Sequence, residues 1–262
     1  MIRFDSIKGY TALVTGATSG IGLAYSELLA QSGCKVILVS IESSVSHIAT
    51  DLCNRYGVES MGIELDLAHK DSADKLYAWC KNNGVEVDIL INNAGIFYFK
   101  ELILLPQTKV EAMMNLHMVT VAKLTRLFAI GMCDRKRGYI LNMSSICADM
   151  PNPGLTMYAS TKAFVKSFTT SMWYELRDYG INICCVTPGG VATGLYSVDE
   201  KWIKLGLKFG VLATPENIAK RGIDAMLRGR RLITPYPINR FFVWLVNGVP
   251  TWLRMKLKRK FL

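Results

Sequence analysis

Short apolar runs alternate along the chain with segments in which apolar residues recur at helical spacing. The apolar runs are rich in aliphatic and β-branched residues, as expected of buried strands. They occupy residues 11–16, 35–40, 60–67, 87–93, 138–145 and 181–189. The segments of helical spacing between them include residues 21–33, 46–57, 70–84 and 106–132. This repeated alternation predicts an α/β fold, a single doubly wound parallel sheet with helices on both faces.

The size and composition of the chain fit one such domain. With 262 residues, 50% of them hydrophobic, the chain can bury one large core. Its seven cysteines form no CxxC pair, which favours a reducing compartment without disulfides or a zinc site. No metal site is expected, because His47, His69 and His117 lack ligand spacing, and core or surface positions are expected for all three. The N-terminal residues contain no continuous apolar segment and no run reaches about 18 apolar residues, so a cytoplasmic protein without a cleaved signal peptide is expected.

Positive charge is concentrated at the C-terminal end. The net charge is +10, and the residues from Arg228 to Leu262 include nine Lys or Arg and no Asp or Glu. We therefore divide the chain into a main domain, residues 1–234, and a basic, apolar C-terminal extension, residues 235–262. The extension fits a helix lying peripherally in the interface of an anionic membrane, and equally a helix packed on its own domain or on a partner subunit. Nucleic acid is not expected as a partner, since no recognition motif accompanies the charge.

A glycine-rich turn joins the first predicted strand to the first predicted helix. Residues 15–22 have the sequence TGATSGIG. In such a turn Gly16 permits the sharp change of direction, Gly20 lets the backbone approach a pyrophosphate, and Gly22 allows close packing of helix on strand. A lone glycine-rich loop is often structural only, but this one follows a strand and opens a helix. Its context favours dinucleotide binding.

Three further residues indicate acid–base chemistry. Tyr158 and Lys162 lie four apart, which places them on one face of a helix, and Ser145 precedes Tyr158 by thirteen residues. A phenol with a pKa near 10 exchanges protons poorly at neutral pH unless a nearby positive charge stabilises its anion. Taken alone, the pair is better explained as an aromatic residue and a solvated charge on an amphipathic helix, because the YxxxK spacing occurs by chance in many chains.

Taken in order, these motifs resemble those of the short-chain dehydrogenase/reductase family over nearly the whole chain. The C-terminal extension is similar to that of the DltE-like subset of the family. The resemblance implies a single Rossmann-type sheet and an NAD(P)-dependent oxidoreductase. The motifs that carry it are TGATSGIG at 15–22, Asp66-Leu67, NNAG at 92–95, Asn115, Ser145, YASTK at 158–162, and Pro188-Gly189 with Thr193.

The resemblance implies a catalytic set of four residues. Tyr158 would be the general acid in carbonyl reduction and the general base in alcohol oxidation. Lys162 would lower the pKa of Tyr158 and bind the nicotinamide ribose, while Ser145, rather than Ser144, would orient the substrate. Asn115, a poor helix former among apolar residues, would mark a local helix distortion whose backbone carbonyl holds a water that relays protons to Lys162.

The resemblance also implies the cofactor contacts. Asp66 would bind the adenine amino group, although an aspartate that caps the next helix would look the same. Asn92 and Gly95 would form the floor under the adenosine ribose, and Val191 and Thr193 would bind the carboxamide and a phosphate. The full expected cofactor set is Gly16, Thr18, Ser19, Gly20, Ile21, Gly22, Ser40, Asp66, Leu67, Asn93, Ala94, Gly95, Tyr158, Lys162, Pro188, Gly189, Val191 and Thr193.

The end of the second predicted strand bears on the choice between NADP and NAD. Ser40 stands where NAD enzymes carry an acid, and Ile41 stands where NADP enzymes often carry Arg. Ser19 replaces the cation that many NADP enzymes place in the glycine turn, while Glu42 lies just beyond the acid position. Because the acid is missing where it usually acts, NADP is favoured over NAD.

The loop at about residues 194–213 is expected to bind the substrate. Its aromatic and aliphatic residues, with Ile96, Phe97, Tyr98 and Phe99, predict an apolar cleft. We expect a lipophilic small molecule, such as a hydroxysteroid, a bile acid or a long-chain ketone. The alternatives are a 3-oxoacyl thioester reductase and a non-catalytic, membrane-associated NAD(P)-binding protein, and the complete catalytic set argues against the second. A homo-oligomer, dimer or tetramer, is also expected.

Overall fold

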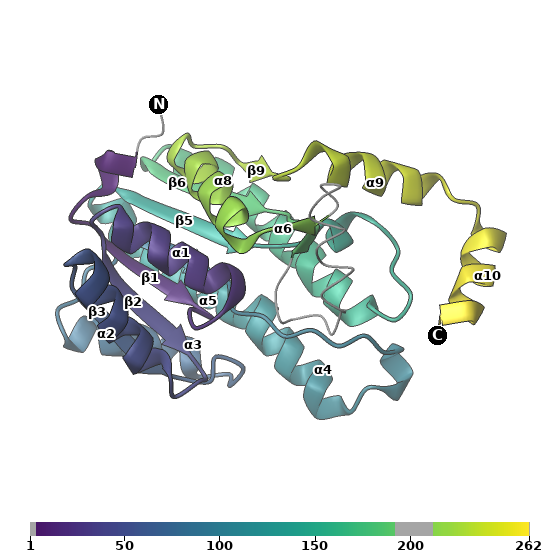
Figure 1. Ribbon diagram of the computed structural model, residues 1–262, viewed down its shortest axis with the longest axis horizontal. Coiled ribbons are helices and arrows are strands. Elements are labelled where there is room, and N and C mark those ends of the chain that lie inside the picture. The colour runs from purple at the N-terminus through teal and green to yellow at the C-terminus, as the bar shows by residue number, and fades with distance from the viewer. Residues whose placement is uncertain (1–3, 192–211, 262) are drawn as a thin grey trace.

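A central parallel sheet organises the chain, whose computed structural model describes residues 4–191 and 212–261 (Figure 1). Its strand order is β3-β2-β1-β4-β5-β6-β9, and every neighbouring pair is parallel. A separate parallel pair joins β7 (Gly190–Val191) to β8 (Leu212–Ala213). The predicted doubly wound sheet is thus confirmed. The strands of the central sheet are β1 (Thr11–Thr15), β2 (Lys35–Ser40), β3 (Ser60–Glu64), β4 (Ile89–Asn92), β5 (Gly138–Met143), β6 (Ile181–Val186) and β9 (Leu232–Ile233).

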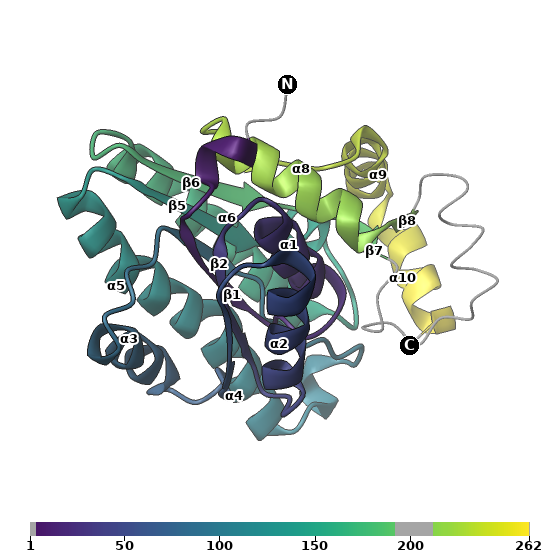
Figure 2. The same ribbon diagram turned by 60° about the vertical axis from the view of Figure 1, so that its left-hand side comes forward.

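Helices cover both faces of this sheet (Figure 2). The side chains of β1 show how two cores arise, because neighbouring residues of a strand point to opposite faces. Ala12 and Val14 join one core, and Leu13 between them joins the other. The first core is covered by α1 (Gly20–Gln31), α2 (Val45–Tyr56) and α8 (Pro215–Leu227), and the second by α3 (Ser72–Asn82), α5 (Val121–Asp134) and α6 (Thr156–Arg177).

The strand order reverses beside β1. The chain runs outward from β1 through β2 to β3 and then returns to β4 on the other side of β1. In open parallel sheets, ligands bind beyond the carboxyl ends of the strands at such a reversal. The glycine turn follows β1 and the NNAG motif follows β4, so both lie at this point.

The long helix predicted over residues 106–132 is continuous but changes its pitch. α4 (Gln107–Met114) passes into the π-helical segment η3 (Asn115–Thr120), which passes into α5. The widened turns begin at Asn115, where a distortion was expected, and such turns are frequent at functional sites. By length and composition the stretch Gln107–Asp134 could cross a membrane, yet half of its most apolar window is buried inside the fold.

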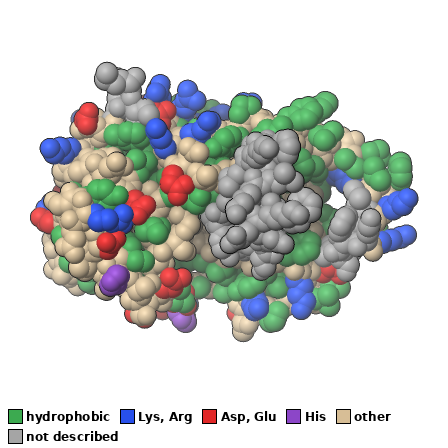
Figure 3. Space-filling view, in the orientation of Figure 1, with side chains coloured by type: hydrophobic (Ala, Val, Ile, Leu, Met, Phe, Trp, Pro, Cys, Tyr) green, Lys and Arg blue, Asp and Glu red, His purple; other side chains and the backbone are tan. Residues whose placement is uncertain are grey.

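Two helices extend beyond the sheet at the C-terminal end of the chain. They are α9 (Pro237–Gly248) and α10 (Thr251–Phe261), drawn in yellow-green and yellow in Figure 1. α9 contacts the 3-10 helix η4 (Ile146–Asp149), where Asn247 Nδ2 donates to the carbonyl oxygen of Asp149 over 2.8 Å. Exposed apolar side chains lie along α9 and near the start of α10, and Figure 3 shows green side chains, with blue Lys and Arg side chains beside them, at that end of the molecule. The exposed apolar residues there include Ile238, Phe241, Phe242, Trp244, Leu245, Trp252 and Met255.

Candidate active site

A cavity of about 500 Å³ lies at the carboxyl ends of the strands, where the strand order reverses. Most of the residues selected from the sequence line it. Thr193 lies outside the described residues, as do residues 194–211 of the expected substrate loop. The predicted residues that line the cavity are Gly16, Thr18, Ser19, Gly20, Ile21, Ser40, Asp66, Leu67, Asn93, Ala94, Gly95, Ser145, Tyr158, Lys162, Pro188, Gly189 and Val191.

Gly22 and Asn115 are not among the lining residues. A Cβ atom on Gly22 would lie 1.9 Å from the carbonyl oxygen of Gly16, so only glycine allows α1 to pack this closely on the turn. This agrees with the packing role expected of the third glycine. Asn115 opens the π-helical segment η3, which packs against α6.

The glycine turn is fastened to the loop that follows β4. Asn93 Nδ2 donates to the carbonyl oxygens of Thr15 and Gly16 over 3.0 and 3.2 Å. In the opposite direction, Thr15 Oγ1 accepts hydrogen bonds from the backbone N–H groups of Asn93 and Ala94, both at 3.0 Å. Two loops far apart in the sequence therefore hold each other at the rim of the cavity.

The expectation for Asn92 is wrong, because this side chain does not line the cavity. Asn92 is the last residue of β4, and its side chain points to the face of the sheet covered by α5 and α6. There Nδ2 donates to Asn142 Oδ1 over 2.8 Å and to Thr125 Oγ1 over 3.2 Å, and Asn142 Nδ2 donates to Thr169 Oγ1 over 3.0 Å. These four buried polar side chains satisfy one another beneath the site. Gly95, expected beside Asn92, does line the cavity.

Tyr158 and Lys162 lie one turn apart on α6, and both side chains are almost fully buried, 8% and 5% exposed. Lys162 Nζ donates to the carbonyl oxygen of Met143 over 3.0 Å and lies 5.7 Å from the centroid of the Tyr158 ring. Burial of the ammonium lowers the pKa of Lys162 from 10.5 to about 8. The fold thus holds a cation beside the phenol at a considerable cost in desolvation.

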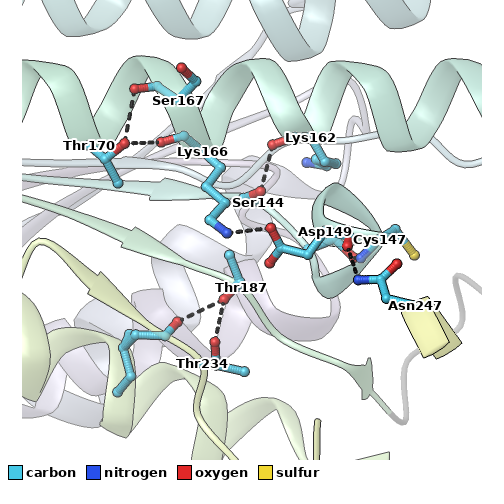
Figure 4. Close-up of polar contacts among 12 residues, drawn as sticks. Ser144, Cys147, Asp149, Lys162, Lys166, Ser167, Thr170, Thr187, Thr234 and Asn247 are labelled. Atoms are coloured by element: carbon cyan, nitrogen blue, oxygen red, sulfur yellow. Dashed lines mark hydrogen bonds and ion pairs between the residues drawn. The ribbon is translucent and has the colours of Figure 1, made fainter. Parts of the chain in front are cut away.

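Ser144 and Ser145 directly follow β5 and have different contacts. Ser144 Oγ donates to the carbonyl oxygen of Lys162 over 2.7 Å and so links β5 to α6 (Figure 4). Ser145 Oγ lies at the cavity and accepts a hydrogen bond from the backbone N–H of Cys147 at 3.2 Å. Because an N–H supplies that bond, the hydrogen of the Ser145 hydroxyl is not used in it.

His117, for which a core or surface position was expected, lies in the core and contacts the site through Tyr158. It is fully buried in η3, and its ring packs edge-on against Tyr158, with centroids 5.8 Å apart. Nε2 accepts a hydrogen bond from the backbone N–H of Ile96 at 3.0 Å, and Nδ1 lies 2.9 Å from Thr161 Oγ1. Burial, and after it the charge of Lys162, holds the pKa of His117 well below 6.5, so the ring is neutral. The sequence signal was a titratable residue in an apolar segment two positions after Asn115.

Comparison with known proteins agrees with this geometry. The model of the short chain dehydrogenase family matches residues 10–204. The chain belongs to the short-chain dehydrogenase family. It is 33% identical to a very-long-chain 3-oxoacyl-CoA reductase of Macaca fascicularis and 36% identical to that of Mus musculus, in each case over 95% of this chain and 78% of the relative.

Solved structures of short-chain dehydrogenases share the fold. A 7beta-hydroxysteroid dehydrogenase superposes with a TM-score of 0.82 at 22% identity, covering 95% of each chain. A short-chain dehydrogenase from Sphingobium yanoikuyae in complex with NADPH superposes with a TM-score of 0.77 at 22% identity, covering 92% of this chain and 97% of the other. The finer likeness to the DltE-like subset stays a prediction.

The lining of this short-chain dehydrogenase fits a nicotinamide dinucleotide, as the family implies. α1 begins at Gly20, and the side chain of its capping residue Ser19 makes no capping hydrogen bond. The first N–H groups of α1 therefore have no side-chain cap and lie at the cavity wall, where a pyrophosphate would accept hydrogen bonds from them.

Two carboxylates and two hydroxyls line the part of the cavity that the family resemblance assigns to the adenosine. Ser40 Oγ is 2.9 Å from Thr18 Oγ1 and accepts a hydrogen bond from the backbone N–H of Glu42 at 3.2 Å. Asp66 Oδ1 accepts a hydrogen bond from the N–H of Ala68 at 2.8 Å, so it stabilises the turn after β3 rather than capping α3, which begins at Ser72. Both acids line the cavity. Among the described lining residues, Lys162 is the only Lys or Arg.

Proposed function

We propose that this short-chain dehydrogenase reduces the keto group of a 3-oxoacyl thioester at the expense of NAD(P)H. The substrate class rests on one observation, the likeness to very-long-chain 3-oxoacyl-CoA reductases over 95% of the chain. This favours the alternative reached from the sequence over the hydroxysteroid or ketone expected first. The reduction itself is supported by the hydroxyl, phenol and ammonium gathered at one cavity.

In the proposed reaction Tyr158 donates its phenolic proton to the keto oxygen as negative charge develops there. Bound NAD(P)H would supply the hydride that adds to the carbon of the same carbonyl. Ser145 donates its hydroxyl hydrogen to that oxygen and holds the group at the phenol. Lys162 stabilises the phenolate left after proton transfer, since its ammonium lies beside the ring. By the family resemblance, the backbone carbonyl of Asn115 would hold a water molecule that relays a proton to Lys162.

An apolar segment beside the phenol suits a long acyl chain. Phe97 packs edge-on against the Tyr158 ring with centroids 5.1 Å apart, and Ile96 lines the cavity. The chain then continues through Phe99, Leu102, Ile103 and Leu104, all of which are exposed. An apolar ligand chain that covers these residues would remove their surface from water, at about 25 cal/mol per Å².

The preference for NADP over NAD belongs to the same proposal. It is supported by Ser40, which lines the cavity with a hydroxyl where an NAD enzyme would hold the ribose with an acid. Glu42 acts against it, because a carboxylate repels a 2′-phosphate. Fluorescence titration with NADPH and NADH measures the balance, and Glu42→Ala should raise the affinity for NADPH more than that for NADH. Tighter binding of NADH by the unaltered protein would overturn the preference.

We further propose that α9 and α10 lie on an anionic membrane, with the protein peripheral to its cytoplasmic face. The aromatic side chains of α9 are turned away from the domain, with Trp244 69% exposed. The segment that follows Arg228 has no acidic residue. Aromatic residues at the headgroup boundary beside cations suit an anionic lipid surface. A homo-oligomer stays a prediction, which sedimentation equilibrium can test.

Vesicle sedimentation tests the membrane contact. Replacing Phe241 and Trp244 together with Ser should abolish binding to vesicles that contain an anionic phospholipid. The matched control is Ile130→Ser, which removes an exposed apolar side chain of α5 on the body of the domain. Unchanged sedimentation of the α9 variant would exclude this surface as the contact.

The reaction is tested by following oxidation of NADPH and NADH with 3-oxoacyl-CoA of increasing chain length, a steroid ketone and an aliphatic ketone. The thioesters should react fastest. Tyr158→Phe should lower kcat by about 100-fold or more, since it removes the proton donor, while the control Tyr179→Phe alters an exposed tyrosine and should have no effect. Rapid reduction of steroid ketones without reduction of thioesters would instead support the hydroxysteroid or ketone substrate expected from the sequence. Full activity of Tyr158→Phe would refute the assigned chemistry.

A further inference from the structure

A second hollow, of about 640 Å³, lies next to the catalytic cavity. Its walls come from η4, α6, the segment 229–234 and α9. Ile146, which directly follows Ser145, and Lys166, one turn beyond Lys162 on α6, both line it. Both cavities therefore have α6 as a wall, and no described residue lines both of them. Neither the family chemistry nor the cofactor uses the second cavity.

The lining of this hollow is strongly cationic. Among the described residues that line it, Lys166, Arg230, Arg231 and Arg240 face a single carboxylate, that of Asp149. Asp149 already forms an ion pair with Lys166, as Figure 4 shows. In this described part of the lining, four cations and one carboxylate leave an excess of three positive charges.

The three arginines form no ion pair with an acid among the described residues. Among the ion pairs of the described residues, none includes Arg230, Arg231 or Arg240, whereas the neighbouring Arg228 is paired with Asp224 over 2.9 Å. Arg231 instead contacts the hydroxyl of Tyr174 and lies 5.3 Å from the centroid of its ring. The positive charges of the three arginines repel one another, because no counterion among the described residues is paired with them. An anion that binds in the hollow is attracted by each cation and reduces this repulsion.

Side chains rather than the backbone would recognise that anion. The N–H groups of Gly229 and Arg230 donate to the carbonyl oxygens of Met226 and Ala225, both over 2.9 Å, and Trp173 Nε1 donates to the carbonyl oxygen of Gly229 over 3.0 Å. The donors left for a ligand are the guanidinium groups. Their planar fork matches the oxygens of a phosphate in a bidentate arrangement.

We infer that this hollow, defined by Lys166, Arg230, Arg231 and Arg240, is a binding site for a phosphate group. The site does not depend on the proposed reduction, because none of these cations lines the catalytic cavity. Two kinds of ligand carry such a phosphate group, a soluble phosphorylated molecule and the headgroup of an anionic phospholipid. The exposed aromatic side of α9, the helix that carries Arg240, lies beside the hollow and brings it within reach of a lipid surface.

Two titrations distinguish the sources, both with the full chain saturated with NADP so that the glycine turn is occupied. In the first, inorganic pyrophosphate is titrated by calorimetry. In the second, vesicles of phosphatidylcholine with and without phosphatidate are sedimented with the protein. Binding of pyrophosphate identifies a soluble ligand as the source, and binding that depends on phosphatidate identifies the headgroup.

The variant with both Arg230→Gln and Arg240→Gln should weaken whichever binding is seen by about tenfold or more, because it removes two charge-assisted contacts. The control Lys220→Gln removes an exposed cation of α8 outside the hollow and should leave binding unchanged. Both residues are exposed, so the double variant should fold normally, and circular dichroism checks that it does. Absence of binding in both titrations, or equal binding by the double variant, overturns the inference. Neither titration measures turnover, so the result is independent of the thioester assay.

Discussion

Replacing Lys162 with Met should make the protein more stable and nearly inactive. The side chain is 5% exposed, and the hydrogen bond found for its ammonium in the structure is the one to the carbonyl of Met143. Its pKa falls from 10.5 to about 8 because burial disfavours the charged form. Met fills a similar volume without a charge, so the substitution removes the desolvation cost while leaving the core filled.

The size of the effect follows from the lowered pKa. Lowering the pKa of Lys162 by about 2.5 corresponds to about 3 kcal/mol. Burying the charged ammonium lowers the free energy of unfolding by this amount. The lost hydrogen bond offsets about 1 kcal/mol, which leaves a net gain of about 2 kcal/mol at pH 7. Above the folded pKa the unfolded chain binds more protons than the folded one, so the stability of the unaltered protein rises with pH toward 10.5. The advantage of the variant should therefore be largest below pH 8 and vanish near about pH 10.

Urea unfolding of the cofactor-free protein at pH 7 and at higher pH measures this difference, with Lys220→Met as the matched control at an exposed position of α8. The control should show no pH-dependent difference from the unaltered protein. A Lys162→Met variant that is destabilised at pH 7, or whose advantage does not change with pH, would refute the reasoning. Its kcat should fall by about 100-fold or more, since the phenolate loses its neighbouring charge.

Three further outcomes follow from the structure. His117 has a pKa held well below 6.5, so stability should fall as pH drops below about 6.5, and urea unfolding should show this acid-side loss reduced in His117→Gln. Gly22→Ala would place a Cβ 1.9 Å from the carbonyl oxygen of Gly16, and we expect a lower melting temperature together with at least a tenfold loss of NADPH affinity by fluorescence titration. Asn142→Leu leaves the buried amide of Asn92 without its nearest acceptor and should lower the free energy of unfolding by about 2 kcal/mol, whereas an unchanged value would show that the amide finds another partner.

The parallel sheet could be predicted because its strands are short apolar runs separated by helical periodicity, both of which are local properties of the sequence. The short strand β9 escaped prediction, since Leu232 and Ile233 are held by pairing with Cys185 and Val186 rather than by a pattern of their own. The cavity lining was mostly foreseen, because motifs that follow parallel strands meet at one edge of the sheet.

The residues that were missed or misplaced depend on distant partners. His117 bonds to residues 21 and 44 positions away, so its environment is invisible in the sequence. The side chain of Asn92 was assigned to the cavity by resemblance, but the alternation of β4 turns it toward Thr125 and Asn142. The polar partners of Asn92 are brought together only when α5 and α6 pack on the sheet, which a local sequence pattern does not show.

The fastening of the loop after β4 to the glycine turn has a consequence for hydrogen exchange. The N–H groups of Asn93 and Ala94 donate hydrogen bonds to Thr15 Oγ1. We therefore expect neither amide to exchange with solvent until these hydrogen bonds to the glycine turn break. Exchange at these two amides should thus report opening of the turn 77 to 79 residues away in sequence. We therefore expect the two loops to open together, as one cooperative unit.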